Sequence, residues 1–333
     1  MADKELSLAI VGTGGIAKQH RKNLQALGGN KIVAVCDLAE ANLKEAAEAT
    51  GATAYTDFRK MFKKEKGLDA VLLCTPPIVR KDVIALACKR KIPVFCEKPP
   101  ARTDKEAKKI TEIIAESGNL VSVGFMYRYM PATDRIKELI AGEKLNLVQG
   151  TFLCNPALAR KIPGWFFIRE KSGGHIVDQA IHMIDLIRFI AGDVTEVHTY
   201  GNNVICPKAE DFTTEDSSST NLRFAGGASG SHVHSWAYAK FVCEVVLTGA
   251  EYRLTLKLND FVNGWIKDKV IDEKFAPAPS GDLRYWEMQV FLNAVRTGDA
   301  SKIRSPYADA AKTLATVNAM NRSIDKGKPI QIG

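Results

Sequence analysis

The stretch Leu6-Ser-Leu-Ala-Ile-Val-Gly-Thr-Gly-Gly-Ile-Ala17 decides the fold class of this chain. Residues 8–11 form a short apolar run, as expected for a strand buried on both faces of a parallel sheet. Gly12, Gly14 and Ala17 then fit the pattern G-x-G-x-x-G/A, which allows a tight turn and the close approach of a pyrophosphate. The sequence therefore predicts a strand, a glycine-rich turn and a helix whose N-terminus binds the phosphates of a dinucleotide.

A second apolar run, residues 32–36, supports this interpretation. It ends directly before Asp37, about 20 residues beyond the glycine turn, where a carboxylate that binds the adenosine ribose belongs. Such a carboxylate repels a 2′-phosphate, and residues 38–40 offer no cation, although Lys44 lies one helical turn further on. These features favour NAD over NADP, and together they disfavour an ordinary strand–turn–helix unit with a surface aspartate.

Strands and helices alternate up to about residue 126, and this alternation predicts a doubly wound parallel sheet. Further strands are predicted at residues 69–74, 93–96 and 120–125, and helices at 39–50, 57–64, 79–90 and 103–117.

Beyond residue 126 the pattern changes. Residues 196–271 read as consecutive strands joined by tight turns, which indicates antiparallel pairing, and helices at 283–297 and 306–325 close the chain. We therefore predict an α/β protein with a dinucleotide-binding domain at residues 1–126 and an α+β domain at residues 127–333.

The composition of the 333 residues excludes several classes of protein. The net charge of +8 is spread along helices with acidic residues between, so we expect no nucleic-acid partner. No run resembles a secretory signal or a membrane span. The seven cysteines are odd in number and lack a Cys-x-x-Cys pair, which predicts neither a disulfide framework nor a zinc site and favours the cytoplasm.

Residues 173–185 carry the most suggestive polar groups. On a helix, Asp178 and His182 share a face because they are four residues apart, and Asp185 also neighbours His182. A carboxylate beside a histidine fixes the imidazole tautomer and stabilises the imidazolium, as a general base requires. A helix face with a His–Asp hydrogen bond and no chemistry explains this stretch equally well.

Three other features stay open on the sequence alone. Glu97-Lys98-Pro99 follows a predicted parallel strand, so Lys98 is either a group in the cofactor cleft or a surface lysine in a turn. Trp165 either stacks on a sugar ring or packs under a long loop. His232 and His234 share one face of a predicted strand, but no third metal ligand has suitable spacing, so a polar sheet face is favoured.

In combination and in order, these motifs resemble the glucose-fructose oxidoreductase/inositol dehydrogenase/MocA-like (Gfo/Idh/MocA) oxidoreductase family. The segments that carry the resemblance are residues 11–17, 75–77, 97–99, 124–129 and 172–182. The resemblance implies an N-terminal Rossmann domain and a C-terminal α+β domain with a large, open, mainly antiparallel sheet. It also implies that the exposed face of this sheet joins subunits into a homodimer or homotetramer.

The resemblance assigns roles to residues at matching positions. Lys98, His182 and Asp178 would be catalytic, with His182 as the acid/base. Cofactor contacts would come from Gly12, Thr13, Gly14, Gly15, Ile16, Ala17, Asp37, Thr75, Pro76, Pro77, Glu97 and Lys98. Substrate contacts would come from Lys98, Tyr127, Arg128, Trp165, Asp178 and His182. Two positions depart from the family pattern, because Arg80 stands where histidine is frequent and Pro100 where an apolar residue such as leucine is usual.

These assignments predict an NAD-dependent dehydrogenase that acts on a secondary alcohol of a sugar, a cyclitol or a sugar derivative. One alternative is an NAD-dependent glycosidase in which the ring carbon is oxidised only transiently. A second is a nucleotide-sensing regulator without catalysis, although such a protein has no need of the set Lys98, Asp178 and His182.

Overall fold

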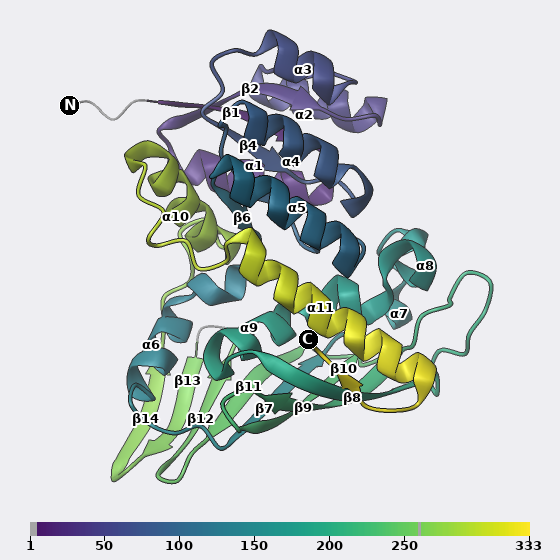
Figure 1. The fold of residues 1–333 in the computed structure, drawn as a ribbon, viewed down its shortest axis with the longest axis vertical. Helices are drawn as coiled ribbons and strands as arrows, with labels where there is room; N and C mark the ends of the chain where they lie inside the picture. The colour runs from purple at the N-terminus through teal and green to yellow at the C-terminus, as the bar shows by residue number, and fades with distance from the viewer. Residues whose placement is uncertain (1–4, 259–260) are drawn as a thin grey trace. The chain divides into compact units, whose positions relative to one another are not determined.

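The computed structural model describes residues 5–258 and 261–333 (Figure 1). The chain divides into a first unit, Met1–Met126 with Pro277–Ala311, and a second unit, Tyr127–Ala276 with Lys312–Gly333. The sequence pattern predicts that everything after residue 126 lies in the second domain. In the structure, Pro277–Ala311 instead belongs to the first unit.

The first unit contains a six-stranded sheet in which every pair of neighbouring strands is parallel. The strand order is β3-β2-β1-β4-β5-β6, the order of a doubly wound dinucleotide-binding sheet, and the predicted fold class is confirmed. The strands are β1 (Leu6–Val11), β2 (Asn30–Cys36), β3 (Thr53–Tyr55), β4 (Ala70–Leu73), β5 (Val94–Cys96) and β6 (Val121–Val123). The short edge strand β3 was not predicted.

The first unit also contains helices, and one of them belongs to the segment Pro277–Ala311, far along the chain from the strands. The helices are α1 (Gly15–Leu27), α2 (Glu40–Thr50), α3 (Phe58–Lys64), α4 (Arg80–Lys89), α5 (Asp104–Ser117) and α10 (Arg284–Thr297), with a 3₁₀ turn at Pro77–Val79. Met288, Phe291 and Leu292 of α10 are fully buried in the same hydrophobic core as β1. Phe291 also meets the ring of Phe95 edge-on, with 5.6 Å between the centroids. This packing explains why the segment around α10 belongs to the first unit.

The second unit contains a nine-stranded sheet in the order β14-β13-β12-β11-β7-β10-β9-β8-β15. Neighbouring strands pair antiparallel except β7 and β10, which are parallel, so the predicted mainly antiparallel sheet is confirmed. The strands are β7 (Leu147–Leu153), β8 (Val194–Asn202), β9 (Ser217–Phe224), β10 (Ser229–Ser235), β11 (Val242–Thr248), β12 (Tyr252–Lys257), β13 (Phe261–Ile266), β14 (Lys269–Lys274) and β15 (Ile330–Gln331).

One face of this sheet packs against helix α9 (Ile181–Ala191). Gly150 of β7 makes the close approach possible, because a Cβ atom there would lie 2.6 Å from Cδ1 of Ile187. The other helical segments are 3₁₀ turns at Met126–Tyr129 and Gly164–Phe167, α6 (Pro131–Leu139), α7 (Pro156–Ala159), α8 (Arg169–Ser172) and a π-helical turn at Ile176–Ala180. The last helix, α11 (Tyr307–Lys326), begins in the first unit and continues into the second from Lys312.

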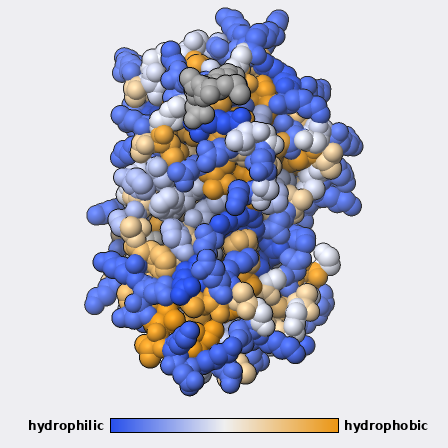
Figure 2. Space-filling view, turned by 90° about the vertical axis from the view of Figure 1, so that its left-hand side faces the viewer, coloured by the Kyte–Doolittle hydropathy of each residue, from blue (hydrophilic) through white to orange (hydrophobic). Residues whose placement is uncertain are grey.

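The face of the molecule drawn in Figure 2 is mostly hydrophilic, with local gatherings of hydrophobic residues. Figure 2 shows one such gathering in the lower part of the view, at the height where Figure 1 draws β12, β13 and β14. Within residues 5–258 and 261–333, none of the helices combines the length and the apolar character that a membrane crossing requires.

Candidate active site

The glycine turn joins the ends of three strands of the parallel sheet. Gly12 has φ of +87°, and a Cβ atom there would lie 2.7 Å from the carbonyl carbon of Cys74 and from the nitrogen of Thr75. Both the backbone angle and the space therefore require glycine. The amide of Gly12 also donates to the carbonyl of Cys36 at 2.8 Å, so the carboxyl ends of β1, β2 and β4 meet at this residue.

The start of helix α1 fits the pyrophosphate of a dinucleotide. Among the described residues, no side chain caps this helix at Gly14, and its first turn holds no acidic residue. A Cβ atom at Gly14 or Gly15 would meet no atom within 4 Å, so the turn faces open space. Unbonded amide groups and the helix dipole then favour an anion at this position.

Asp37 lies against the glycine turn, at the end of β2. Its Oδ2 accepts hydrogen bonds from the amide of Thr13 at 2.6 Å and from the Thr13 hydroxyl at 3.0 Å. Its Oδ1 accepts from the amide of Ala39 at 2.8 Å. The carboxylate is thus held in place by the loop whose phosphate site it adjoins, while the next side chain, Leu38, is 86% exposed.

The Lys98 segment follows β5 at the same edge of the sheet. The side chain of Lys98 is half-buried, and its peptide bond to Pro99 is cis. The carbonyls of Glu97, Lys98 and Pro99 all accept hydrogen bonds from the guanidinium of Arg80. The next carbonyl, that of Pro100, accepts a hydrogen bond from the hydroxyl of Tyr307 at 3.0 Å. Each of the four carbonyls of residues 97–100 therefore has a hydrogen-bond donor.

Glu97 is buried and bonded on both oxygens. Oε1 lies 2.7 Å from Nε2 of the fully buried His20, and Oε2 accepts from the amide of Lys98 at 3.1 Å. Burial acts to raise the pKa of Glu97, but the hydrogen bond and charge of His20, together with the charges of Arg284 and Lys98, outweigh it and lower the pKa to about 2. Glu97 is therefore a carboxylate that ties α1 to the Lys98 segment.

In the second unit, Asp178 lies in the π-helical turn and His182 in the first turn of α9. Both side chains are half-buried, and the rings of Tyr127 and His182 meet with centroids 5.5 Å apart. Gln179 fixes the turn, because its Oε1 accepts from the thiol of Cys154 at 3.0 Å and from the indole of Trp236. A single π-turn within a helix is frequent at functional sites, and the sequence pattern gave no sign of it.

Arg128 and Asp185 form a buried ion pair. Nε and Nη2 of Arg128 each donate to a separate oxygen of Asp185 at 2.6 Å, and the Thr313 hydroxyl donates to Oδ1 at 2.7 Å. Asp185 was expected beside His182, and Arg128 among the substrate contacts. Arg128 and Asp185 are thus paired with each other, and Asp178 is the remaining acidic candidate for His182.

Three other groups were singled out by the sequence, namely Trp165, His232 and His234. Trp165 is 40% exposed and stacks on Phe166 at 3.8 Å, so its role in substrate binding stays a prediction. His232 and His234 were expected on a polar sheet face, and they share the inner face of β10, opposite hydroxyl side chains of β9. This polar face is buried, and both histidines are fully buried on it. There the ring of His234 stacks on that of His175, with centroids 5.0 Å apart.

Burial dominates the ionisation of these three histidines. Burial and the charge of Arg169 lower the pKa of His175 to about 3, and burial with the charge of His175 lowers the pKa of His232 to about 3. The pKa of His234 is lowered in the same sense. Within the part of the chain that the structure describes, no group of three or more histidine, cysteine, aspartate or glutamate side chains is placed to hold a metal ion.

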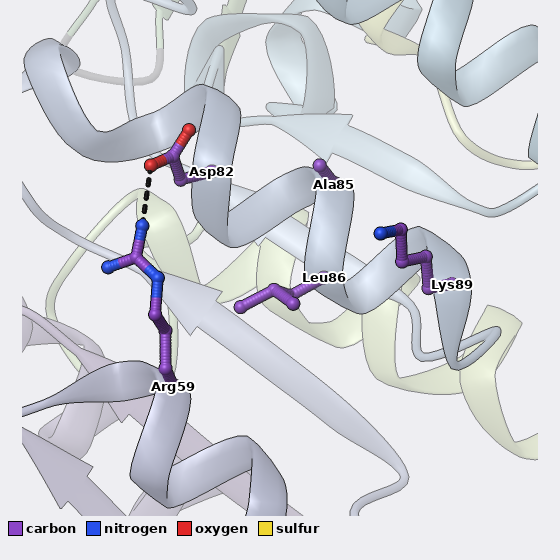
Figure 3. Close-up of a pocket in the computed structure, with 5 residues that line it drawn as sticks. All are labelled: Arg59, Asp82, Ala85, Leu86 and Lys89. Carbon is purple, nitrogen blue, oxygen red and sulfur yellow. Dashed lines mark hydrogen bonds and ion pairs between the residues drawn. The ribbon is translucent and has the colours of Figure 1, made fainter.

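A hollow of about 210 Å³ opens between α3 and α4. Figure 3 shows its lining of Arg59, Asp82, Ala85, Leu86 and Lys89. Arg59 and Asp82 form an ion pair of 2.8 Å across it, and both side chains are more than half exposed. None of the sequence-predicted site residues lines this hollow.

Two family models match the chain. Residues 6–125 match "Oxidoreductase family, NAD-binding Rossmann fold", and residues 134–254 match "GFO/IDH/MocA C-terminal domain". Fold and site thus define an oxidoreductase with an NAD-binding Rossmann domain, as the sequence predicted. The chain belongs to the Gfo/Idh/MocA oxidoreductase family.

Known relatives include enzymes of inositol and sugar oxidation. The scyllo-inositol 2-dehydrogenase (NAD(+)) of Bacillus subtilis (strain 168) is 29% identical over 231 residues, 68% of this chain and 66% of the relative. The inositol 2-dehydrogenase of Rubrobacter xylanophilus is 31% identical over 208 residues, 60% of this chain and 56% of the relative. The aligned segments thus span less than two thirds of these relatives. A levoglucosan dehydrogenase in complex with NADH shares the fold, with a TM-score of 0.86, 20% identity and coverage of 98% of this chain and 99% of that one.

Proposed function

We propose that this protein is an NAD-dependent dehydrogenase that oxidises a secondary alcohol of a sugar, a cyclitol or a sugar derivative. The observation that carries the proposal is the place of Lys98. It follows β5 at the carboxyl edge of the parallel sheet, where the glycine turn and Asp37 also lie and where such sheets bind their ligands. The relatives' activities on inositol support the substrate class.

In the proposed reaction, each side chain has one task. NAD, when bound, supplies the acceptor for the hydride. The imidazole of His182 takes the proton of the substrate hydroxyl, and the carboxylate of Asp178 orients that imidazole and the substrate. The ammonium of Lys98 donates a hydrogen bond to the alcohol oxygen and stabilises the negative charge that develops there.

The cofactor is assigned to residues of the first unit. Residues 12–17 form the pyrophosphate site, in which the amides at the start of α1 (residues 14–17) donate to the phosphates, while those of Gly12 and Thr13 hold the turn through Cys36 and Asp37. Asp37 binds the ribose hydroxyls, and residues 75–77 with Glu97 and Lys98 border the nicotinamide. Tyr127, beside His182, and Trp165 are proposed to contact the substrate, whereas Arg128 acts through its ion pair with Asp185.

Turnover with a panel of alcohols tests this function. The purified protein is incubated with NAD⁺ and scyllo-inositol, myo-inositol, levoglucosan or a glucoside, while NADH absorbance and released products are followed together. We expect net NADH formation with at least one secondary alcohol, in amounts equal to the ketone formed.

Two results would contradict the proposal in different ways. Cleavage of the glucoside without accumulation of NADH would identify a glycosidase with transient oxidation. Tight NAD⁺ binding by calorimetry with no turnover of any compound would favour a nucleotide-sensing regulator.

A further inference from the structure

Arg80 is a buried arginine whose described hydrogen bonds all go to main-chain carbonyls. It begins α4, and it is 2% exposed. Nε and Nη2 donate to the carbonyl of Thr75 at 3.1 and 2.6 Å. Nη2 also donates to the carbonyl of Lys98 at 3.3 Å, and Nη1 donates to those of Glu97 and Pro99. One guanidinium therefore joins the turn after β4 to the segment after β5.

The segment needs these donors because of its own sequence. Pro99 and Pro100 have no amide hydrogen, so residues 97–100 cannot continue the ladder of β5. Buried carbonyls without a donor cost free energy, and a guanidinium offers five N–H groups in a rigid planar fork. Arg80, with Tyr307 on the last carbonyl, satisfies the whole segment.

We propose that Arg80 is a positioning residue for Lys98. Its guanidinium donates to the carbonyls on both sides of Lys98 and also to the carbonyl of Thr75. It therefore fixes the position of the Lys98 backbone, from which the side chain extends, relative to the turn proposed to border the cofactor. The inference rests on the proposed function of Lys98, and it gives a task to a residue that departs from the family pattern.

Arg90 provides a matched control at the other end of the same helix. It also donates to main-chain carbonyls, namely those of Phe62, Glu65 at 2.9 Å and Lys66 at 3.3 Å. Arg90→Met therefore removes a similar set of hydrogen bonds without touching residues 75 or 97–99. Arg80→Met should lower kcat by at least about tenfold and change the Kd of NAD⁺ by less than about fivefold, whereas Arg90→Met should leave both within about twofold.

A double-mutant cycle separates positioning from a general effect on the fold. In a Lys98→Met protein, adding Arg80→Met should lower the residual kcat by less than about twofold, because effects of coupled residues are not additive. Arg80→Lys keeps the charge but presents its donors from one point, so its kcat should fall between those of the wild type and Arg80→Met. A full, additive loss in the Lys98→Met background would overturn the proposal.

A second measurement requires no substrate. The rate at which an acylating reagent labels Lys98, followed by peptide mass spectrometry across a pH series, should change in Arg80→Met and Arg80→Lys and stay unchanged in Arg90→Met. If Arg80→Met does not fold, Arg80→Lys carries both tests. An unchanged labelling profile in the Arg80 variants would overturn the positioning role, whereas a changed profile in a protein without alcohol turnover would contradict only the proposed function.

Discussion

Asp37 provides the charge at the ribose end of the cofactor site. Its carboxylate is held by Thr13 and the amide of Ala39, so it cannot swing away from an additional phosphate. A 2′-phosphate there would meet a fixed negative charge at short range. We predict that kcat/KM with NAD exceeds that with NADP by at least about tenfold, or roughly 1.4 kcal/mol.

Two cations that could weaken this preference have other partners. Arg80 is buried among main-chain carbonyls, and Lys44 lies 4.0 Å from Glu48 on the exposed side of α2. Asp37→Ala should therefore weaken NAD binding and narrow the preference, and Asp37→Ser with Leu38→Arg should reverse it. Equal use of both cofactors by the wild type would contradict the argument, and loss of NADP activity in Lys44→Met would then identify the phosphate ligand.

His182 is the proposed general base. His182→Ala should lower kcat by at least about 100-fold, the usual contribution of a positioned base. In the wild type, the rate of alcohol oxidation should rise with pH, because the imidazole accepts a proton only when it is neutral. Phe189→Leu on the same helix is the control, and it should keep the pH profile. A flat profile together with an active alanine variant would assign His182 to structure.

At the scale of elements, the periodicity of apolar residues predicted most of the fold. Buried strands such as β1 and β4 are continuous apolar runs, and an amphipathic helix such as α5 shows its buried face in the sequence. The short edge strands β3 and β15 were not predicted, because two or three residues are too few to show an alternation of apolar and polar side chains. The position of α10 was not predicted either, because the apolar face of a helix does not indicate which sheet it packs against.

The candidate site was predicted in its residue types and less in its contacts. Lys98, Asp178 and His182 follow from motifs, but the pairing of Arg128 with Asp185 and the contacts of Arg80 join segments distant in sequence. Local sequence patterns do not predict contacts between such distant segments. The one sign available in the sequence was an arginine three residues after Thr75-Pro76-Pro77, and its burial could only come from the fold.

The inner face of β10 makes the second unit sensitive to acid. The pKa values of His175 and His232 lie at about 3 in the folded state against 6.5 without burial, and that of His234 is lowered too. Between pH 6.5 and 3 the unfolded chain therefore binds more protons, so the free energy of unfolding falls as the pH decreases. Each histidine contributes a slope of up to about 1.4 kcal/mol per pH unit in this window.

Denaturant unfolding at several pH values between neutrality and 5 measures this slope. His232→Leu should reduce it, and should cost little stability because both ring nitrogens lack a described hydrogen-bond partner. Thr220→Val is the control, because Thr220 lies opposite His232 on β9 and does not titrate in this range. An unchanged slope in His232→Leu would refute the interpretation.

At the scale of the whole molecule, the outer face of the nine-stranded sheet is the proposed subunit interface. Trp265 is 44% and Val270 84% exposed, and they are directly paired in register, so they share this face. Tyr200 is 62% and Val233 38% exposed on the same face. The exposed apolar side chains on this open sheet could pack against the same face of a second copy of the chain.

Light scattering tests this prediction of a homodimer or homotetramer. Trp265→Glu should shift the mass toward the monomer, because a charge would be buried without a partner. Leu158→Glu, on α7 and 47% exposed, is the control and should leave the mass unchanged. A monomeric wild-type protein would contradict the proposal that this face forms a subunit interface.

The return of the chain to its first unit determines how this protein can be divided. The dinucleotide-binding module is discontinuous, so a gene segment ending at residue 126 encodes a sheet without Met288, Phe291 and Leu292 in its core. That fragment should bind hydrophobic dyes and resist purification as a monomer. Fusing residues 277–311 to it through a flexible linker should restore NAD⁺ binding by calorimetry. Exchange of the cofactor module between relatives therefore needs three junctions, one after residue 126 and one at each end of residues 277–311.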